Sequence, residues 1–138
     1  MSGSRIALLS ALALTVLAGC GSSPSDQVRS TLRGFADATA KRDYQALCDD
    51  YFSPALVDQV EQAGLPCEAA IRPEISATRN PKLDIRSVDV NGDRALAKVH
   101  TSAANQPASD DTIQLLKVKG KWRIASLAQT GPQPSGAP

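Results

Sequence analysis

The spacing of apolar residues changes once along this chain and divides it into a helical half and a strand half. Up to residue 81 the apolar residues recur at intervals of three and four, which is the spacing of one helix face. From residue 83 onward they alternate with polar residues, as in strands that bury one face. Helices followed by strands predict an α+β fold in which N-terminal helices pack on an antiparallel sheet.

Four helical segments are expected in the first half. Ser53 followed by Pro54 is the clearest start signal, because Pro is favoured at the first helical position. Ser25 and Asp43 are the predicted N-caps of the first two helices. The expected segments are 26–41, 44–51, one that starts at Pro54 and stops at Gly64, and one from Pro66 to Ile75 with Pro73 inside it.

Three or four strands joined as a meander are expected in the second half. The alternation changes parity at residues 86–87, which predicts a β-bulge and a bent strand. Asn91-Gly92 predicts a hairpin, and 119–121 a second tight turn. Residues 102–110 are expected to form a loop. Because a bulged sheet curls, we expect the helices to cover its concave face in a cone-like arrangement with space for a pocket.

Residues 1–19 have the features of a secretory leader. Arg5 precedes an apolar run over 6–17, which is shorter than the roughly 20 residues that span a bilayer. The run ends in Leu-Ala-Gly-Cys at 17–20, which resembles the bacterial lipobox. The resemblance implies that Cys20 is lipidated, becomes the mature N-terminus and anchors the protein to the outer face of the cell membrane. The alternatives are an ordinary signal peptide with a chance cysteine at the cut, or an uncleaved anchor.

The mature part is expected to hold one domain. Without the leader 119 of the 138 residues remain, enough for one core. We expect the lipidated cysteine and a flexible tether over 20–25, the domain over 26–128 and a disordered tail over 129–138. The chain has 15 Lys plus Arg against 14 Asp plus Glu, and the leader contributes one Arg. A neutral domain gives no reason to expect a nucleic-acid partner.

Two cysteines remain after Cys20, at Cys48 and Cys67. Export would place them in an oxidising compartment, where we expect them to form one disulfide. Two separate buried thiols are the alternative. The chain has a single His and no Cys-x-x-Cys, so no metal site and no cofactor are expected.

Three short segments, 41–48, 51–56 and 116–127, carry a family resemblance, and the last contains Gly-Lys-Trp-Arg-Ile. Together with the order of elements they resemble the nuclear transport factor 2-like superfamily, including its SnoaL-like members. The resemblance implies a cone-shaped fold with a cavity, often dimeric through its sheet. The superfamily includes isomerases, dehydratases and cyclases, and many members without catalysis.

Candidates for catalysis are few. Members that resemble ketosteroid isomerase or scytalone dehydratase place a carboxylate or an Asp–His pair in the cavity. Here His100 is expected on a solvated strand face, Asp49-Asp50 at a cap and Asp110-Asp111 at a turn. For the two tyrosines and the tryptophan, core packing is the alternative to a ligand-binding role. The candidate cavity-lining residues are Phe35, Tyr44, Tyr51 and Trp122.

We therefore expect a non-catalytic lipoprotein on the extracytoplasmic face of the membrane that binds a small apolar ligand or a protein partner, which includes a second copy of itself. An isomerase- or dehydratase-like enzyme that uses the cavity is one alternative. A structural accessory domain of the cell envelope is another. Polar groups that converge in the cavity would favour the enzyme, and a large exposed apolar patch would favour a protein partner.

Overall fold

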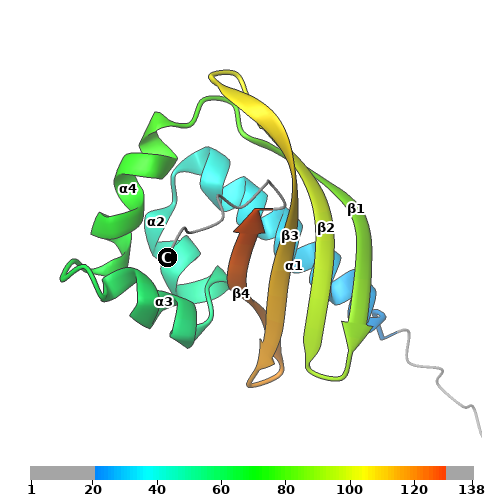
Figure 1. Cartoon of the computed structure of the whole chain (residues 1–138). Coiled ribbons are helices and arrows are strands. Elements are labelled where there is room, and N and C mark those ends of the chain that lie inside the picture. The colour runs from blue at the N-terminus through cyan, green and yellow to red at the C-terminus, as the bar shows by residue number, and fades with distance from the viewer. Residues whose placement is uncertain (1–20, 130–138) are drawn as a thin grey trace, which may run out of the picture.

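Four antiparallel strands form one curved sheet, and a long helix crosses its concave face (Figure 1). The computed structural model describes residues 21–129. Cys20, the leader and residues 130–138 of the expected tail lie outside the described residues, and Gln129, the first residue of that tail, is instead the last residue of the final strand. The predicted α+β architecture is confirmed.

The helices come first and the strands second, as the apolar spacing predicts. The shorter helices gather beside the β4 edge of the sheet (Figure 1). Among residues 21–129, no helix is long and apolar enough to cross a membrane. The elements are α1 (Pro24–Lys41), α2 (Tyr44–Ala46), a π-helical turn (Leu47–Tyr51), α3 (Pro54–Glu61), α4 (Cys67–Ala77), β1 (Lys82–Asn91), β2 (Arg94–Ala103), β3 (Gln106–Val118) and β4 (Lys121–Gln129).

The first helix begins earlier than the sequence predicts. Ser23, not Ser25, is the N-cap: its hydroxyl accepts a hydrogen bond from the Asp26 backbone N–H at 3.1 Å and donates to the Asp26 carboxylate at 2.7 Å. Pro24 then occupies the first helical turn, where its missing N–H leaves no bond unmade. Residues 24–25 therefore belong to α1 and not to the expected tether.

The other helix start signals are confirmed. The Asp43 carboxylate accepts from the Ala46 N–H at 3.1 Å, and the buried Ser53 hydroxyl accepts from the Leu56 N–H at 3.2 Å. The expected helix over 44–51 is a single α-helical turn that continues as the π-helical turn. Local side chains determine where a capped helix starts. No local side-chain pattern predicts this change from α-helix to π-helix.

The sheet is a simple meander in the order β1-β2-β3-β4. The predicted bulge is present, since the β1–β2 register shifts between Ile85 and Ser87. The β3–β4 turn is also as predicted, with Lys119 and Gly120 at φ 48° and 78°. The predicted loop over 102–110 is wrong. Most of it is strand, and only Ala104 and Asn105 separate β2 from β3.

One core lies between α1 and the concave face of the sheet. Leu32 of α1 is fully buried and belongs to one apolar cluster with side chains of the central strands and β4. The close approach of α1 to the π-helical turn requires a glycine, because a Cβ at Gly34 would lie 2.8–2.9 Å from two ring carbons of Tyr51. The largest fully buried apolar side chains are Val28, Leu32, Leu47, Val99, Leu115 and Ile124.

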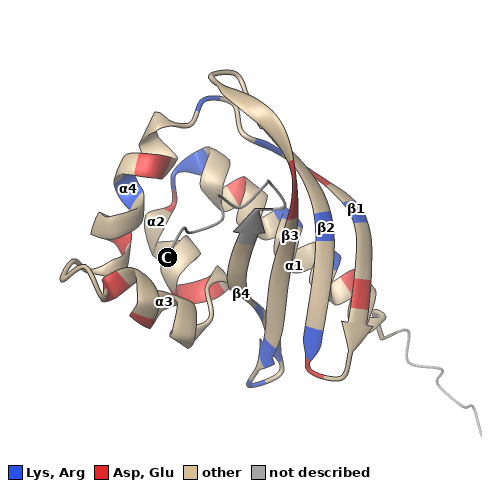
Figure 2. Cartoon of the chain, in the orientation of Figure 1, with Lys and Arg blue, Asp and Glu red and all other residues tan. Residues whose placement is uncertain are grey.

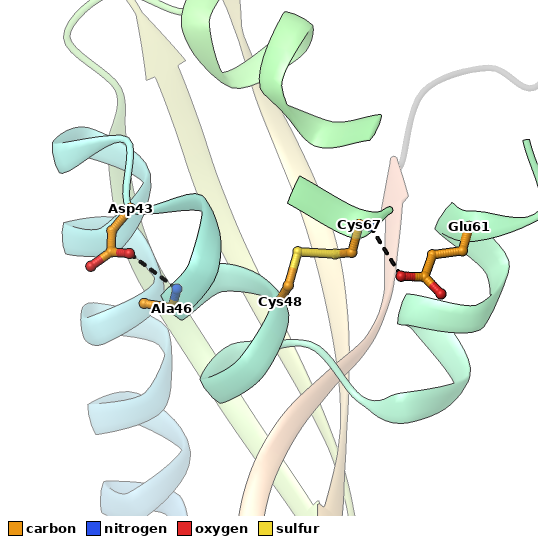
Figure 3. Close-up of a disulfide and its surroundings, with 5 residues drawn as sticks. All are labelled: Asp43, Ala46, Cys48, Glu61 and Cys67. Atoms are coloured by element: carbon orange, nitrogen blue, oxygen red, sulfur yellow. Dashed lines mark hydrogen bonds between the residues drawn. A yellow bond between two sulfur atoms is a disulfide. The ribbon is translucent and has the colours of Figure 1, made fainter. Parts of the chain in front are cut away.

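Three connections tie the helical half together and to the sheet. Cys48 of the π-helical turn and Cys67 at the start of α4 form a disulfide across a Cα–Cα distance of 6.1 Å, as the sequence predicts (Figure 3). The Glu61 carboxylate accepts from the Cys67 N–H at 3.1 Å and so caps α4 (Figure 3). Farther along, the Ser53 N–H donates to the Ile124 carbonyl of β4 at 2.8 Å.

Candidate functional site

A cavity of about 200 Å³ opens between the second half of α1, the start of β1 and the β2–β3 hairpin. One part of its wall is apolar, and the other carries hydroxyl groups, one carboxylate, the Gln106 amide and the Lys82 ammonium group. The apolar part is made by Phe35, Ala36, Pro81, Leu83 and Pro107. The polar part includes Thr39, Thr78, Thr101, Ser109 and Asp111.

Two hydroxyl groups of the polar part of the wall are arranged around the carboxylate of Asp111. One of its oxygens, Oδ2, accepts hydrogen bonds from the Thr101 hydroxyl at 2.7 Å and the Ser109 hydroxyl at 2.8 Å. The two hydroxyl oxygens are themselves 3.0 Å apart. Each hydroxyl has a single proton, so both protons are committed to the carboxylate. The arrangement fixes the position of the carboxylate on the inner face of the sheet.

The second oxygen of Asp111, Oδ1, is buried and has no hydrogen-bond partner among the described residues. A buried acceptor without a donor costs about 1–3 kcal/mol, and more when it is charged. Asp111 lines the cavity but Oδ1 is closed to solvent in this conformation, so an N–H or O–H group of a bound molecule would relieve this cost after a small rotation of the side chain. The cavity therefore combines an apolar surface with one strong hydrogen-bond acceptor, which is the usual composition of a site for a small organic ligand.

Sequence reasoning missed Asp111 and Ser109 as site residues. Both fall in the stretch taken for a loop or turn, yet the β2–β3 register pairs Asp111 with Val99 and Ser109 with Thr101 on the inner face. Strands that line a cavity lose the apolar alternation that marks a buried face, because their inward positions are polar. The alternation of side chains along a strand could have identified these two residues, because residues 109, 111, 113 and 115 share one side of the strand.

The four predicted cavity residues do not share one site. Phe35 lines the cavity. Tyr51 and Trp122 border a different hollow, near the start of α1, and Trp122 is otherwise buried in the core. The Tyr44 hydroxyl bonds the Ser76 hydroxyl at 2.7 Å, and the Arg72 guanidinium lies over its ring at 4.6 Å. The prediction for Tyr44 is wrong because its face of the helix meets α4, not the sheet.

The single histidine lies on the opposite face of the sheet from the cavity. His100 Nδ1 is 2.8 Å from Asp110 Oδ1, and the Asp110 side chain is 81% exposed. Adjacent residues of a strand point to opposite faces, so Asp110 and Asp111 serve different surfaces. Among residues 21–129, no group of three His, Cys, Asp or Glu side chains could hold a metal ion.

Solved structures similar to this one have the nuclear transport factor 2-like fold. An NTF2-like protein of unknown function from Silicibacter pomeroyi is 22% identical, with 74% of this chain and 90% of that chain covered and a TM-score of 0.54. A second, from Shewanella baltica, is 21% identical, with 74% and 88% covered and a TM-score of 0.54. A de novo designed protein with this fold is 17% identical, with 81% and 90% covered and the same score.

The sequence comparison is more specific than the fold. The model of the family described as "putative lumazine-binding" matches residues 23–128, and this chain belongs to that family. The matched range spans every described helix and all but the last residue of β4. None of the curated proteins matches the sequence.

Proposed function

We propose that this protein is a lipid-anchored extracytoplasmic module that binds a small organic ligand in the cavity under α1. The observation that carries the proposal is the Asp111 carboxylate, which two hydroxyls hold in the cavity wall while its second oxygen lacks a partner. The ligand class is a molecule with an apolar ring or chain and at least one N–H or O–H donor for this carboxylate.

The volume of the cavity limits the size of the ligand. A volume of about 200 Å³ corresponds to roughly seven water molecules at about 30 Å³ each. This is below the range of about 300–1,000 Å³ typical of sites for drug-sized ligands. Lumazine, the compound named in the family description, is a compact bicyclic ring with N–H donors. Its chemistry fits a small cavity with an apolar wall and an acceptor, and it is the first probe to use.

Binding fits the cavity better than catalysis. A lone carboxylate could serve as a general base, but an enzyme of the isomerase type also needs donors for the charge that develops on the substrate. The hydroxyl protons of Thr101 and Ser109 are already committed to Asp111, and the other donors that line the cavity, such as Lys82 and Gln106, make no hydrogen bond to it in the described residues. His100 faces the other side of the sheet, and Tyr44 contacts α4.

The cavity is tested with the full chain and lumazine as the probe. We expect Asp111→Asn to weaken lumazine binding by about 10- to 100-fold, because a hydrogen bond to a charged group is worth about 1.5–3 kcal/mol. Isothermal titration calorimetry measures the change. The matched control is Asp110→Asn on the outer face, which should leave the affinity unchanged.

Two results would contradict the cavity proposal. One is equal affinity in wild type and Asp111→Asn while both have the same melting temperature. The other is native mass spectrometry of the protein from its own cell that shows no bound small molecule, combined with no binding of lumazine. Turnover of a bound carbon acid that Asp111→Asn abolishes would favour the enzyme instead.

The anchor is tested separately at Cys20. We expect Cys20→Ser to move the protein from the membrane fraction to the soluble fraction, because the thioether that carries the diacylglyceryl group cannot form on serine. Fractionation followed by intact mass measurement reads both location and acyl mass. Ser22→Ala, in the same tether, is the control and should stay in the membrane fraction with the acyl mass intact. Membrane retention of Cys20→Ser equal to wild type would exclude the anchor.

A further inference from the structure

We propose that the β3–β4 hairpin docks the domain against an anionic phospholipid surface, with Lys119 and Lys121 as its main contacts. The proposal deepens the one above and rests on the lipid anchor at Cys20. It adds a second attachment point, which would give the tethered domain a fixed orientation on the membrane.

The hairpin carries a concentration of positive charge. Residues 112–129 contain four basic residues and no acidic one. The basic colour gathers at the ends of β3 and β4 that meet at this turn (Figure 2). We call this segment the basic hairpin, and its residues are Lys117, Lys119, Lys121 and Arg123.

The four basic side chains are not equivalent. Lys117 lies over the Trp122 ring, 5.7 Å from its centroid, and Arg123 donates to the Asp49 carbonyl. Lys119 and Lys121 are exposed at the turn. Within the described part of the chain, none of the four forms an ion pair. The turn therefore presents two unpaired ammonium groups to whatever lies next to it.

The tether places a membrane next to this turn. Gly120 and Lys121 line the same surface hollow as Ser22 and Asp26, so the hairpin lies beside the start of α1. Cys20 precedes Pro24 by four residues, and four extended residues span at most about 14 Å. A lipid-bearing Cys20 would hold the first turn of α1 within that distance of the headgroups. The hairpin shares this end of the domain.

Nearby carboxylates offset much of the positive charge of this end. Asp26 and Asp50 line the same hollow as Lys121, and Asp49 and Asp58 line a second hollow with Lys119 and Lys121. In the adjacent β1–β2 turn, Asp93 and Arg94 offset each other. The exposed lysines are still the groups nearest the tip of the hairpin, and an anionic surface within about one Debye length, roughly 10 Å at 0.1 M salt, attracts them.

An anionic bilayer is the occupant that the geometry favours. The anchor would keep the membrane near the hairpin at all times, so even a weak attraction acts at a high effective concentration. A basic residue near an anionic lipid surface contributes about a fivefold change in affinity. Two exposed lysines therefore give about 25-fold.

The test uses the lipidated full chain in two kinds of vesicle, phosphatidylcholine alone and phosphatidylcholine with phosphatidylglycerol. A lysine-acylating reagent is added, and mass spectrometry reads the rate at each lysine. We expect Lys119 and Lys121 to react several-fold more slowly on the anionic vesicles at low salt, with the difference lost at high salt. Lys41 and Lys82, exposed at the other end of α1 and of the sheet, are internal controls with equal rates on both.

Failure of this proposal and failure of the anchor give different results. Flotation on pure phosphatidylcholine reports the anchor alone, and a protein that stays behind lacks it. A protein that floats but shows equal acylation rates of Lys119 and Lys121 on both vesicles overturns the docking proposal. As a second readout, Lys119→Gln with Lys121→Gln should raise the rate at Lys117 on anionic vesicles. The matched pair Lys41→Gln with Lys82→Gln should not.

Discussion

Replacing Leu32 with alanine is expected to lower the free energy of unfolding by about 2–5 kcal/mol. Leu32 is fully buried where α1 meets the sheet, so the change removes its apolar contacts and leaves a cavity in the only core shared by the two halves of the described chain. Urea unfolding followed by circular dichroism measures the loss.

The matched control for this prediction is Leu96→Ala. Leu96 lies on the outer face of β2 and is 47% exposed, so the same chemical change should cost well under half as much. Equal losses for the two variants would show that α1 does not pack on the sheet as described.

Removing the disulfide is the second change with a large expected effect. Replacing both Cys48 and Cys67 with alanine is expected to lower the free energy of unfolding by about 3 kcal/mol, because the loop that the bond closes spans 19 residues. Both cysteines are buried, so repacking around the alanines adds to the loss. Urea unfolding with and without dithiothreitol measures it.

A reductant provides the control. Dithiothreitol should destabilise the wild type by a similar amount and leave the double variant unchanged. A wild type whose unfolding midpoint does not respond to full reduction would contradict the prediction, as would two free thiols in unreduced protein by mass spectrometry.

Sequence reasoning predicts this fold well where the signal is local. Ser53-Pro54, the bulge after Ile85 and the turn at Lys119-Gly120 each appear in the structure because a few neighbouring residues determine them. The N-cap of α1 is also determined locally and was still predicted wrongly. Ser23-Pro24 repeats the Ser-Pro start of α3, and Ser23 rather than Ser25 bonds Asp26.

The candidate site is harder to predict than the fold. Aromatic residues were the expected lining, yet of the four only Phe35 reaches the cavity. The residue that gives the cavity its chemistry is Asp111, which looks like a turn residue because hydroxyl and carboxylate side chains replace the apolar alternation of β3. Only the pairing of β3 with β2 reveals that Thr101, Ser109 and Asp111 meet.

The meander has a consequence for the order of folding. Every strand pair joins sequence neighbours, so the hairpins can form early with little loop-closure entropy. The Ser53–Ile124 hydrogen bond instead joins residues about 70 apart, and closing such a loop costs about 4 kcal/mol. Folding is therefore expected to begin in the C-terminal hairpins and to finish when the helical half closes over β4. A chain interrupted before Ile124 would lack the last wall of its core.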